Sequence, residues 1–387
     1  MKKILYIASA AKKHICHFHL PYIKWFKEKG CIVHAAAGDD FEEGEKKDIP
    51  YSDRFYRLPI SRSPFRFGNI KAYRYLKKLI RENRYDLICC NTPVGAALGR
   101  LAARKARKKT GTKVVYISHG FHFYEGCPKI YMLYYLIEKL LVPYTDAMVT
   151  INKEDYEVVK KLCKNRKYGT PCVYYVHGMG VDTKKYVSCT CSREKIREML
   201  GIPQEATVLV SVSEINRNKN LAVTIKALAH LCSDMKPSAK TELYYIICGI
   251  GEELAANREL AKELGIADRV RFLGYRHDIE IILHAADIFL FPSIREGLGM
   301  APIEAMSAGL PVIASDIRGV REYAVDGYNS ILIKDPMDVK GFAKAVRSLC
   351  DEKSVRQKMG KNAAESVKNF DLEYSMKAFA QIFGGLL

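Results

Sequence analysis

Two carboxylates flanking a glycine-containing loop offer the clearest chemistry in this sequence. Glu296 and Glu304 are separated by seven residues within FLFPSIREGLGMAPIE. The pattern predicts a buried strand that ends at Pro292 and a helix that begins near Ala301, with Pro302 in its first turn. Free N–H groups at that helix start favour an anion such as pyrophosphate. Each carboxylate can accept two hydrogen bonds from a sugar or ribose diol.

Either carboxylate also has a plainer interpretation. Glu296 fits a solvated loop residue, and Glu304 fits a favourable charge near a helix N-terminus. The strand-loop-helix context around the pair favours a binding site over these two alternatives.

A second candidate lies in the polar loop of VSVSEINRNKNLAVTIKAL, between a strand that ends at Ser213 and a helix that starts near Leu221. Arg217 and Lys219 supply cations there, and a leaving diphosphate needs cationic stabilisation. A lysine at such a junction is also commonly a solvated surface residue. The chain contains no Asp-x-Asp, so it lacks the paired carboxylates that could bridge a metal ion to a diphosphate. We therefore expect a metal-independent reaction without a cofactor.

Histidines gather at two places in the first half of the chain. One is the loop after a predicted strand in YISHGFHFY, which contains His119 and His122; the other is KKHICHFHL, with His14, Cys16, His17 and His19. Zinc needs about four ligands in tetrahedral reach, and contiguous residues seldom supply them without partners elsewhere. No metal site is predicted, and the role of the second group is left open.

Apolar runs rich in β-branched residues alternate with longer amphipathic stretches along all 387 residues. This alternation is typical of parallel sheets covered by helices on both faces. It predicts an α/β protein with two doubly wound units. The predicted strands are 4–8, 32–36, 87–90, 114–117, 208–212, 243–248, 288–291 and 312–314.

The domain boundary is expected between 181 and 193, where the periodicity is lost. The predicted domains are residues 1–185 and 190–370, followed by a helix at 371–387 that packs back towards the first domain.

The segment REGLGMAPIEAMSAGLPVIASDIRGVREYAVDGYNSILI resembles the donor-site signature of the retaining glycosyltransferases of family 4. That family has two facing Rossmann-like domains with a cleft between them, the GT-B fold. The resemblance implies that Glu296 contacts the donor sugar and Glu304 the ribose. It also implies that backbone amides hold the sugar and phosphate, from Gly297, Leu298, Gly299, Met300 and Ala301.

Shorter segments extend the resemblance. In the family, an Arg precedes the diphosphate-binding Lys by five positions; Lys219 matches the Lys, but Glu214 occupies the Arg position. Arg217 could replace that charge, with Asn218 in the same donor loop. FLGYRHD resembles the base-reading turn, which implies backbone contacts near Tyr275 and Arg276. His119 matches the acceptor-domain histidine, so the expected catalytic residues are His119, Glu296 and Lys219; His19 and His122 are expected on the acceptor side.

Other stretches, including FHLPYIKWFKEKG and LPISRSPF, resemble a bacterial polysaccharide-assembly branch of the family. The expected function is therefore retaining transfer from a nucleotide sugar, with UDP as the expected nucleotide. The expected acceptor is a saccharide on a polyprenyl diphosphate, in exopolysaccharide or capsule biosynthesis.

Positive charge is concentrated in the first half. Residues 1–180 contain 34 Lys and Arg against 16 Asp and Glu, whereas residues 181–387 contain 28 against 27. A basic half suits an anionic partner, and basic helices beside aromatic residues suit an anionic membrane surface. The candidate contacts are Phe65, Phe67, Lys71, Arg74, Lys78 and Arg104, the last within a basic run at 100–109.

A solvated basic face is the alternative. The most span-like apolar run, Ile130 to Val142, is interrupted by Glu138 and Lys139 and is shorter than the ~18–20 residues of a bilayer span. The expectation is therefore a cytoplasmic protein bound peripherally to the inner face of the membrane.

Two other classes of protein fit part of the sequence. CGIGEEL begins like the dinucleotide-binding glycine motif of an NAD(P)-dependent oxidoreductase, but Leu254 replaces the third glycine. The sequence pI near 9.3 would suit nucleic acid, yet no recognition motif accompanies it. Neither is preferred, and no nucleic-acid partner is expected.

Overall fold

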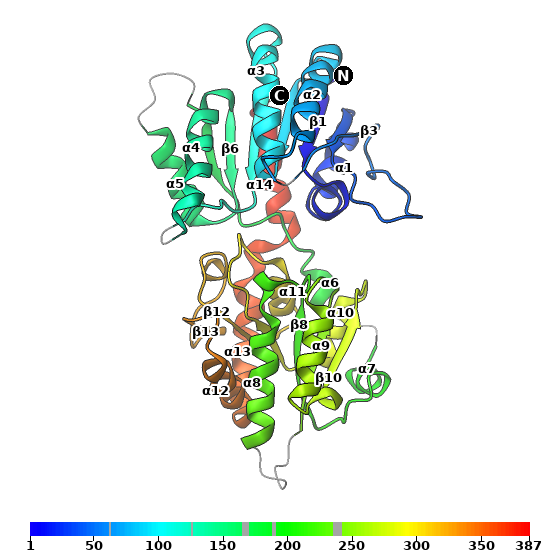
Figure 1. Cartoon of the computed structure of the whole chain (residues 1–387), viewed down its shortest axis with the longest axis vertical. Helices are drawn as coiled ribbons and strands as arrows, with labels where there is room; N and C mark the ends of the chain where they lie inside the picture. The colour runs from blue at the N-terminus through cyan, green and yellow to red at the C-terminus, as the bar shows by residue number, and fades with distance from the viewer. Residues whose placement is uncertain (62, 125–126, 165–169, 188–190, 235–241) are drawn as a thin grey trace. The chain divides into compact units, whose positions relative to one another are not determined.

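The computed structural model describes residues 1–61, 63–124, 127–164, 170–187, 191–234 and 242–387, and the chain forms two units (Figure 1). Unit 1 comprises Met1–Gly180 and Glu373–Leu387, and unit 2 comprises Val181–Leu372. The expected boundary region was 181–193, of which 188–190 lie outside the described residues. Each unit is built around its own parallel sheet.

The sheet of unit 1 has seven strands in the order β3-β2-β1-β4-β5-β6-β7. All neighbouring strands in it are parallel. The strands are β1 (Lys3–Ala8), β2 (Ile32–Ala37), β3 (Arg54–Arg57), β4 (Leu87–Asn91), β5 (Lys113–Ser118), β6 (Ala147–Thr150) and β7 (Cys172–Tyr175). The central strand β4 is buried at every residue, as expected for a strand covered on both faces.

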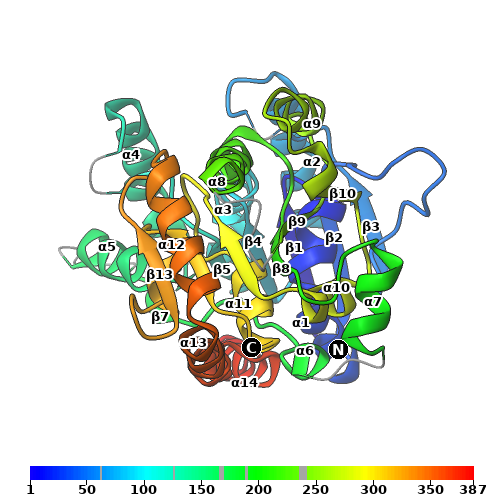
Figure 2. The same cartoon turned by 90° about the horizontal axis from the view of Figure 1, so that it is seen from below.

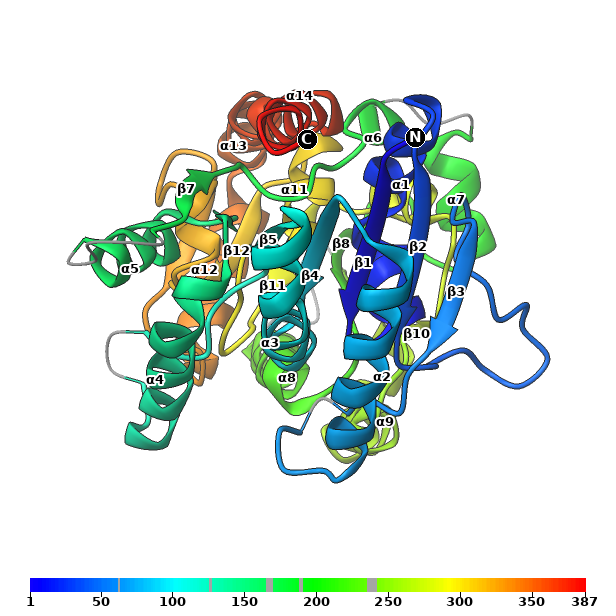
Figure 3. The same cartoon turned by 90° about the horizontal axis from the view of Figure 1, so that it is seen from above.

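Helices cover both faces of this sheet. α2 and α3 lie on one face and α1 on the other (Figure 3). α14 packs on α1, where the rings of Tyr22 and Phe379 are 4.6 Å apart and those of Phe26 and Phe383 are 4.9 Å apart. The α-helices are α1 (Leu20–Glu28), α2 (Gly68–Asn83), α3 (Pro93–Thr110), α4 (Met132–Leu141), α5 (Lys153–Cys163) and α14 (Leu372–Gly384); the short helices are η1 (Ala11–Cys16, a π-helix), η2 (Lys129–Tyr131) and η3 (Val142–Tyr144).

The sheet of unit 2 has six parallel strands in the order β10-β9-β8-β11-β12-β13. The strands are β8 (Thr207–Val212), β9 (Leu243–Cys248), β10 (Val270–Gly274), β11 (Ile288–Phe291), β12 (Val312–Ser315) and β13 (Ser330–Ile333). Their core joins apolar side chains of β8, β9 and β11 to those of α8 and α12. The predicted α/β class with two doubly wound units is confirmed.

α8 and α9 lie on one face of this sheet and α10 and α11 on the other (Figure 2). The α-helices are α6 (Lys184–Val187), α7 (Arg193–Met199), α8 (Leu221–Asp234), α9 (Leu254–Glu263), α10 (Ile279–Ala285), α11 (Met300–Ser307), α12 (Val339–Asp351) and α13 (Lys353–Ser366); the short 3-10 helices are η4 (Arg217–Lys219), η5 (Ala267–Arg269), η6 (Val320–Glu322) and η7 (Lys368–Phe370). None of the described helices of either unit has the length and apolar character that a bilayer span requires.

Strand order places a switch point in each sheet. In unit 2 the chain leaves β8 for β9 on one side, and β11 pairs with β8 on the other. In unit 1, β1 has β2 on one side and β4 on the other. Ligands of doubly wound proteins bind beyond the carboxyl ends of the strands at such points. The loops after β8 and β11, and those after β1 and β4, are therefore the places to examine.

Candidate active site

The loops that follow β8 and β11 are joined by their backbones and side chains. The N–H of Ile294 donates to the carbonyl of Asn218 at 2.8 Å, and the Asn218 amide donates to the carbonyl of Arg295 at 2.9 Å. Asn220, in the left-handed region at φ 53°, donates to the carbonyl of Pro292 at 3.2 Å. These bonds hold the two loops side by side at the switch point of unit 2.

Lys219 and Glu296 meet across these loops. Lys219 Nζ lies 2.6 Å from Glu296 Oε1, and the side chains are 20% and 13% exposed. The Asn216 side chain accepts from the Lys219 N–H at 3.2 Å and so fixes the turn that carries the lysine. The structure thus brings together two of the three predicted catalytic residues as a largely buried ion pair.

Arg217 and Glu214 stand outside this pair. Arg217 is exposed on η4, two residues before Lys219. Glu214 is also exposed and accepts from the Asn216 amide at 3.2 Å. The substitution of Glu for the family's Arg therefore lies at a solvent-accessible position, with Arg217 close to it in the chain.

The loop from Gly297 to Gly299 is tightly packed. A Cβ on Gly319 would lie 2.8 Å from the carbonyl carbon of Gly297 and from the nitrogen of Leu298. The Tyr323 hydroxyl donates to the Leu298 carbonyl at 3.2 Å. Gly299 has φ +83°, which favours glycine, and it is the N-cap residue of α11. The loop is thereby held in one shape.

The start of α11 keeps its donors available. Gly299 offers no side chain to cap the helix, so the N–H groups of Met300 and Ala301 point out of the first turn, as helix starts do. The helix dipole adds partial positive charge at the same place. Backbone donors and Lys219 together make this edge of unit 2 suited to a diphosphate.

Glu304 lies in α11 and contacts a different set of residues. The Tyr186 hydroxyl hydrogen-bonds to its carboxylate, and Lys185 is close enough to stabilise the charge. Burial nevertheless dominates and raises the pKa of the Glu304 carboxyl. Tyr186 belongs to α6, in a segment predicted only as an irregular connection, and no pattern in the sequence indicated its contact with Glu304.

The turn after β10 lies at the same edge of the sheet. Tyr275 is 64% exposed. Its ring lies edge-on to that of His277, with the ring centroids 4.9 Å apart. Arg276 forms two bonds to the Asp278 carboxylate, 2.8 Å and 2.5 Å long. The arginine side chain is thus engaged locally, and the backbone of this turn is what a ligand could contact.

The close approach of a neighbouring loop explains the glycines of CGIGEEL. A Cβ on Gly249 would collide with the Ser213 carbonyl, and one on Gly251 would collide with the Ile215 carbonyl. The Ile215 N–H donates to the Ile250 carbonyl at 2.8 Å. These glycines let the loops after β8 and β9 approach each other, so the motif no longer requires a dinucleotide to explain it.

In unit 1, His119 directly follows β5 and belongs to a buried group. Its ring centroid is 4.4 Å from that of His14 and 5.2 Å from that of His19. Burial lowers the pKa of His119 to about 3, with a smaller contribution from His17. His122 lies apart and stacks on Tyr134 at 4.7 Å. The structure joins the two predicted residues His19 and His119 and leaves His122 outside the group.

The predicted surface residues of unit 1 are exposed. Phe65 and Phe67 are 82% and 85% exposed, and the charged side chains on α2 and α3 also face solvent: Lys71, Arg74, Lys78 and Arg104. The basic run at 100–109 is not uniformly a surface cluster, and the inclusion of Arg100 was wrong. Arg100 is fully buried and forms two bonds to Glu138, 2.7 Å and 2.9 Å long.

Sequence models of known families match both units. Residues 192–366 match the model described as glycosyl transferases group 1, and residues 3–152 match glycosyl transferase 4-like. EpsD of Bacillus subtilis (strain 168), by name a glycosyltransferase, is 40% identical over 100% of this chain and 97% of its own. The Escherichia coli UDP-Gal:alpha-D-GlcNAc-diphosphoundecaprenol alpha-1,3-galactosyltransferase is 28% identical over 81% of this chain and 79% of its own.

Solved structures share the fold. HepE of Anabaena, crystallised with UDP and glucose, superimposes with a TM-score of 0.77 at 21% identity over 100% of both chains. WaaG, a glycosyltransferase of lipopolysaccharide biosynthesis, gives a TM-score of 0.76 at 18% identity over 98% of this chain and 100% of its own. At these identities the likeness concerns the arrangement of helices and strands.

Proposed function

The chain belongs to the family-4 glycosyltransferases of the GT-B fold, and we propose that it transfers a sugar from UDP to a saccharide on a polyprenyl diphosphate, with retention of configuration. Glycosyl transfer in glycan biosynthesis is the activity of the family. The E. coli relative is named for a UDP-Gal donor and a diphosphoundecaprenol acceptor, and HepE was crystallised with UDP. These names support the donor and acceptor classes that we propose.

The ion pair of Lys219 and Glu296 beside the uncapped start of α11 carries the proposal. A nucleoside diphosphate gains negative charge as its bond to the sugar breaks, and a fixed cation with nearby backbone donors stabilises that charge most where water is excluded. Lys219 is 20% exposed and is oriented by Glu296 at 2.6 Å. The pair therefore presents a cation before any donor arrives.

Each carboxylate then has a separate task. Glu296, at the loop before α11, would accept hydrogen bonds from hydroxyls of the donor sugar. Glu304, held by the Tyr186 hydroxyl, would accept from the ribose diol. The two carboxylates have different partners, which matches two different parts of one ligand.

The proposed step is a front-side displacement. The bond between the anomeric carbon and the diphosphate oxygen breaks, and the diphosphate leaves with the electron pair. The acceptor oxygen forms its bond on the same face of the sugar and passes its proton to the departing diphosphate. Lys219, Arg217 and the N–H groups of Met300 and Ala301 stabilise the leaving group, so this step requires no metal ion.

His119 would act as a neutral group in this scheme. Because burial holds its pKa near 3, the imidazole is uncharged at neutral pH and can donate one hydrogen bond to a sugar hydroxyl. It would contribute orientation and selectivity, whereas the cationic assistance comes from unit 2.

Unit 1 supplies features that suit a membrane-borne acceptor at the cytoplasmic face. Phe65 and Phe67 are exposed and directly precede α2, whose basic side chains are also exposed. α4 and the turn before it expose apolar side chains, Ile130 at 70%, Leu136 at 53% and Leu140 at 71%. Charge and apolar side chains on one unit favour peripheral binding to an anionic bilayer.

Donor binding is the direct test. The unfolding midpoint of the full chain should rise with UDP and UDP-sugars, because a ligand that binds only the folded state stabilises it. Glu304→Ala should raise the donor KM and leave little transfer activity. Glu263→Ala, an exposed carboxylate at the far end of α9, is the matched control. Unchanged donor affinity and full activity in Glu304→Ala would contradict the assignment.

A further inference from the structure

Three histidine rings from two segments of unit 1 converge near the carboxyl ends of its strands. His14 lies in the π-helix after β1, His19 directly precedes α1, and His119 follows β5. Their ring nitrogens include one from each residue that all lie within 4.8 Å of one another. No other group of three or more His, Cys, Asp or Glu among the described residues has this property.

The local backbone explains how His14 and His19 come together. η1 spans Ala11–Cys16 as a π-helix, in which each turn takes up one residue more than in an α-helix. His19 lies three residues beyond the end of η1, where its backbone N–H donates to the carbonyl of Ile15 at 2.9 Å in an α-type turn. The carboxylate of Asp40 accepts from the N–H groups of Lys12 and Lys13 at 2.7 Å and 2.9 Å and fixes the start of this turn.

The cluster contains buried nitrogens without hydrogen-bond partners in the described residues. His19 is 0% exposed, and neither of its ring nitrogens has a partner. Nε2 of His119 is also buried and without a partner. A buried polar atom left unsatisfied destabilises the folded state, so such a group calls for an occupant that the protein itself does not supply.

The spacing of the rings fits one tetrahedral metal ion. With Zn–N bonds of about 2.0–2.1 Å, three imidazoles on one zinc ion place their ring centroids roughly 5 Å apart. The observed centroid distances are 4.4 Å, 5.2 Å and 5.2 Å. Nitrogens on such an ion are about 3.4 Å apart, so the widest pair needs only a modest contraction from 4.8 Å.

We propose that His14, His19 and His119 bind a divalent transition-metal ion, with Zn²⁺ as the best-fitting ion and solvent in the fourth position. Neutral imidazole is the form that binds metal. An all-nitrogen set suits zinc, copper or nickel and does not suit the oxygen-seeking Mg²⁺ or Ca²⁺.

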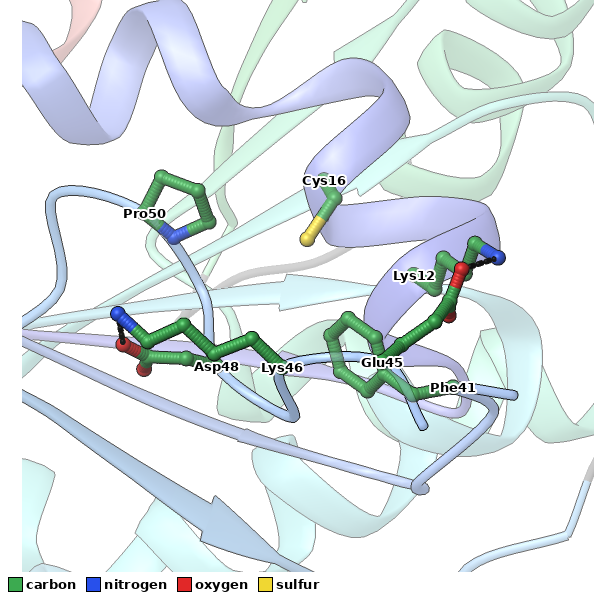
Figure 4. Close-up of a pocket in the computed structure, with 7 residues that line it drawn as sticks. All are labelled: Lys12, Cys16, Phe41, Glu45, Lys46, Asp48 and Pro50. Carbon is green, nitrogen blue, oxygen red and sulfur yellow. Dashed lines mark hydrogen bonds and ion pairs between the residues drawn. The ribbon is translucent and has the colours of Figure 1, made fainter. Parts of the chain in front are cut away.

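The neighbouring Cys16 and His17 are not members of this site. Cys16 lines a pocket with Phe41, Glu45 and Pro50, and its sulfur points into that pocket (Figure 4). The His17 ring packs edge-on against Phe18 at 4.5 Å.

The ion would tie the segment after β1 to the loop after β5. β1 and β5 are separated by β4 in the sheet. One ion would therefore fix the mutual position of the segments that follow β1 and β5. This role concerns the shape of unit 1 and is independent of the diphosphate chemistry proposed for unit 2.

The test is metal uptake by the untagged, full-length chain. Protein stripped with a chelator and re-equilibrated with Zn²⁺ should retain about one equivalent after gel filtration, measured by elemental analysis. Co²⁺ in its place should give the visible absorption of a tetrahedral site. His14→Gln and His119→Gln should each lower the affinity at least tenfold in competition with a chromophoric chelator, as expected when one of three ligands is lost.

Matched controls lie in the same segment. His17→Gln and Cys16→Ser should keep the full equivalent of Zn²⁺, and circular dichroism of each stripped variant reports whether it folds. Zn²⁺ should also raise the unfolding midpoint of the stripped wild type, but not that of His14→Gln. Uptake of no zinc by the folded wild type would overturn the proposal. Equal loss of binding in His17→Gln or Cys16→Ser would overturn it as well.

Discussion

The two units place their positive charge differently. In unit 2 a cation lies inside the candidate site, where Lys219 pairs with Glu296 at 2.6 Å. In unit 1 burial lowers the pKa values of His19 and His119, and the cations considered for partner binding, such as those of α2, lie on exposed surfaces. Charge distribution therefore separates the proposed donor site from the proposed membrane-binding surface.

The sites also differ in how they are satisfied. Lys219 and Glu296 form an ion pair without a ligand, so a donor diphosphate would join an existing network. The ring nitrogens of His19 have no hydrogen-bond partner among the described residues, so the proposed metal ion would be their first partner. The proposed site of unit 2 would bind a substrate that is consumed in each reaction cycle. The proposed site of unit 1 would bind a metal ion permanently.

The largest effect is expected at Lys219. Lys219→Met should lower kcat by about 10²–10³, the usual cost of losing one preorganised group at a developing charge. Lys219→Arg should recover part of this activity because it restores the cation. Initial rates with saturating donor measure both.

The matched control for this change is Lys262→Met. Lys262 also pairs with a glutamate, Glu259, at 3.0 Å, but the two side chains are 64% and 61% exposed. Exposed pairs contribute about 0–1 kcal/mol, and activity should be unchanged. Equal kinetics for Lys219→Met and wild type would remove the contrast between the two units.

The next effect concerns the basic face of α2. The triple variant Lys71→Gln, Arg74→Gln and Lys78→Gln should weaken binding to anionic liposomes by about 3 kcal/mol at low salt, since each cation near the surface contributes about 1 kcal/mol. Cosedimentation at rising salt measures this loss. Lys340→Gln, Lys344→Gln and Arg347→Gln on α12 of unit 2 make the same charge change on exposed side chains, and should leave binding intact.

A smaller effect is expected at His119. His119→Gln should lower kcat roughly fivefold to tenfold, the value of one hydrogen bond of about 1 kcal/mol. The donor KM should stay unchanged, because the proposed donor contacts all belong to unit 2. His17→Gln is the control, with wild-type kinetics expected. A rise in donor KM without a change in kcat would place His119 in donor binding instead.

The sequence predicted the part of the site that is contiguous in the chain. The strand, loop and helix start around Glu296 follow one another within a few residues, so local patterns and the family resemblance located them. The pairing of Glu296 with Lys219 spans 77 positions and depends on β8 lying beside β11. The convergence of His119 with His14 depends on sheet order in the same way. The order of strands was not predicted.

Local patterns also missed strands that are short or only partly buried. β3 and β7 are the edge strands of unit 1, and their sequences RFYR and CVYY are partly exposed, so they lack the continuous apolar run of a central strand. Arg100 belongs to a basic run, yet its partner Glu138 lies 38 positions away. Only the packing of α3 on α4 reveals that this charge is internal.

The smallest effect should appear in the stability of Glu304→Gln. Burial raises the pKa of the Glu304 carboxyl in the folded chain, so the folded state holds that proton more tightly than the unfolded state. The contribution of this group to stability is therefore full below the unfolded pKa of about 4.3 and is lost as pH rises through the folded value.

Gln cannot ionise, so the variant should unfold at a slightly higher midpoint than wild type at pH 7, while its donor affinity falls. The difference in midpoint should shrink as pH is lowered towards 4, and calorimetry at several pH values measures it. A variant less stable than wild type at pH 7 would mean that the hydrogen bond from Tyr186 stabilises the ionised Glu304 carboxylate by more than burial destabilises it.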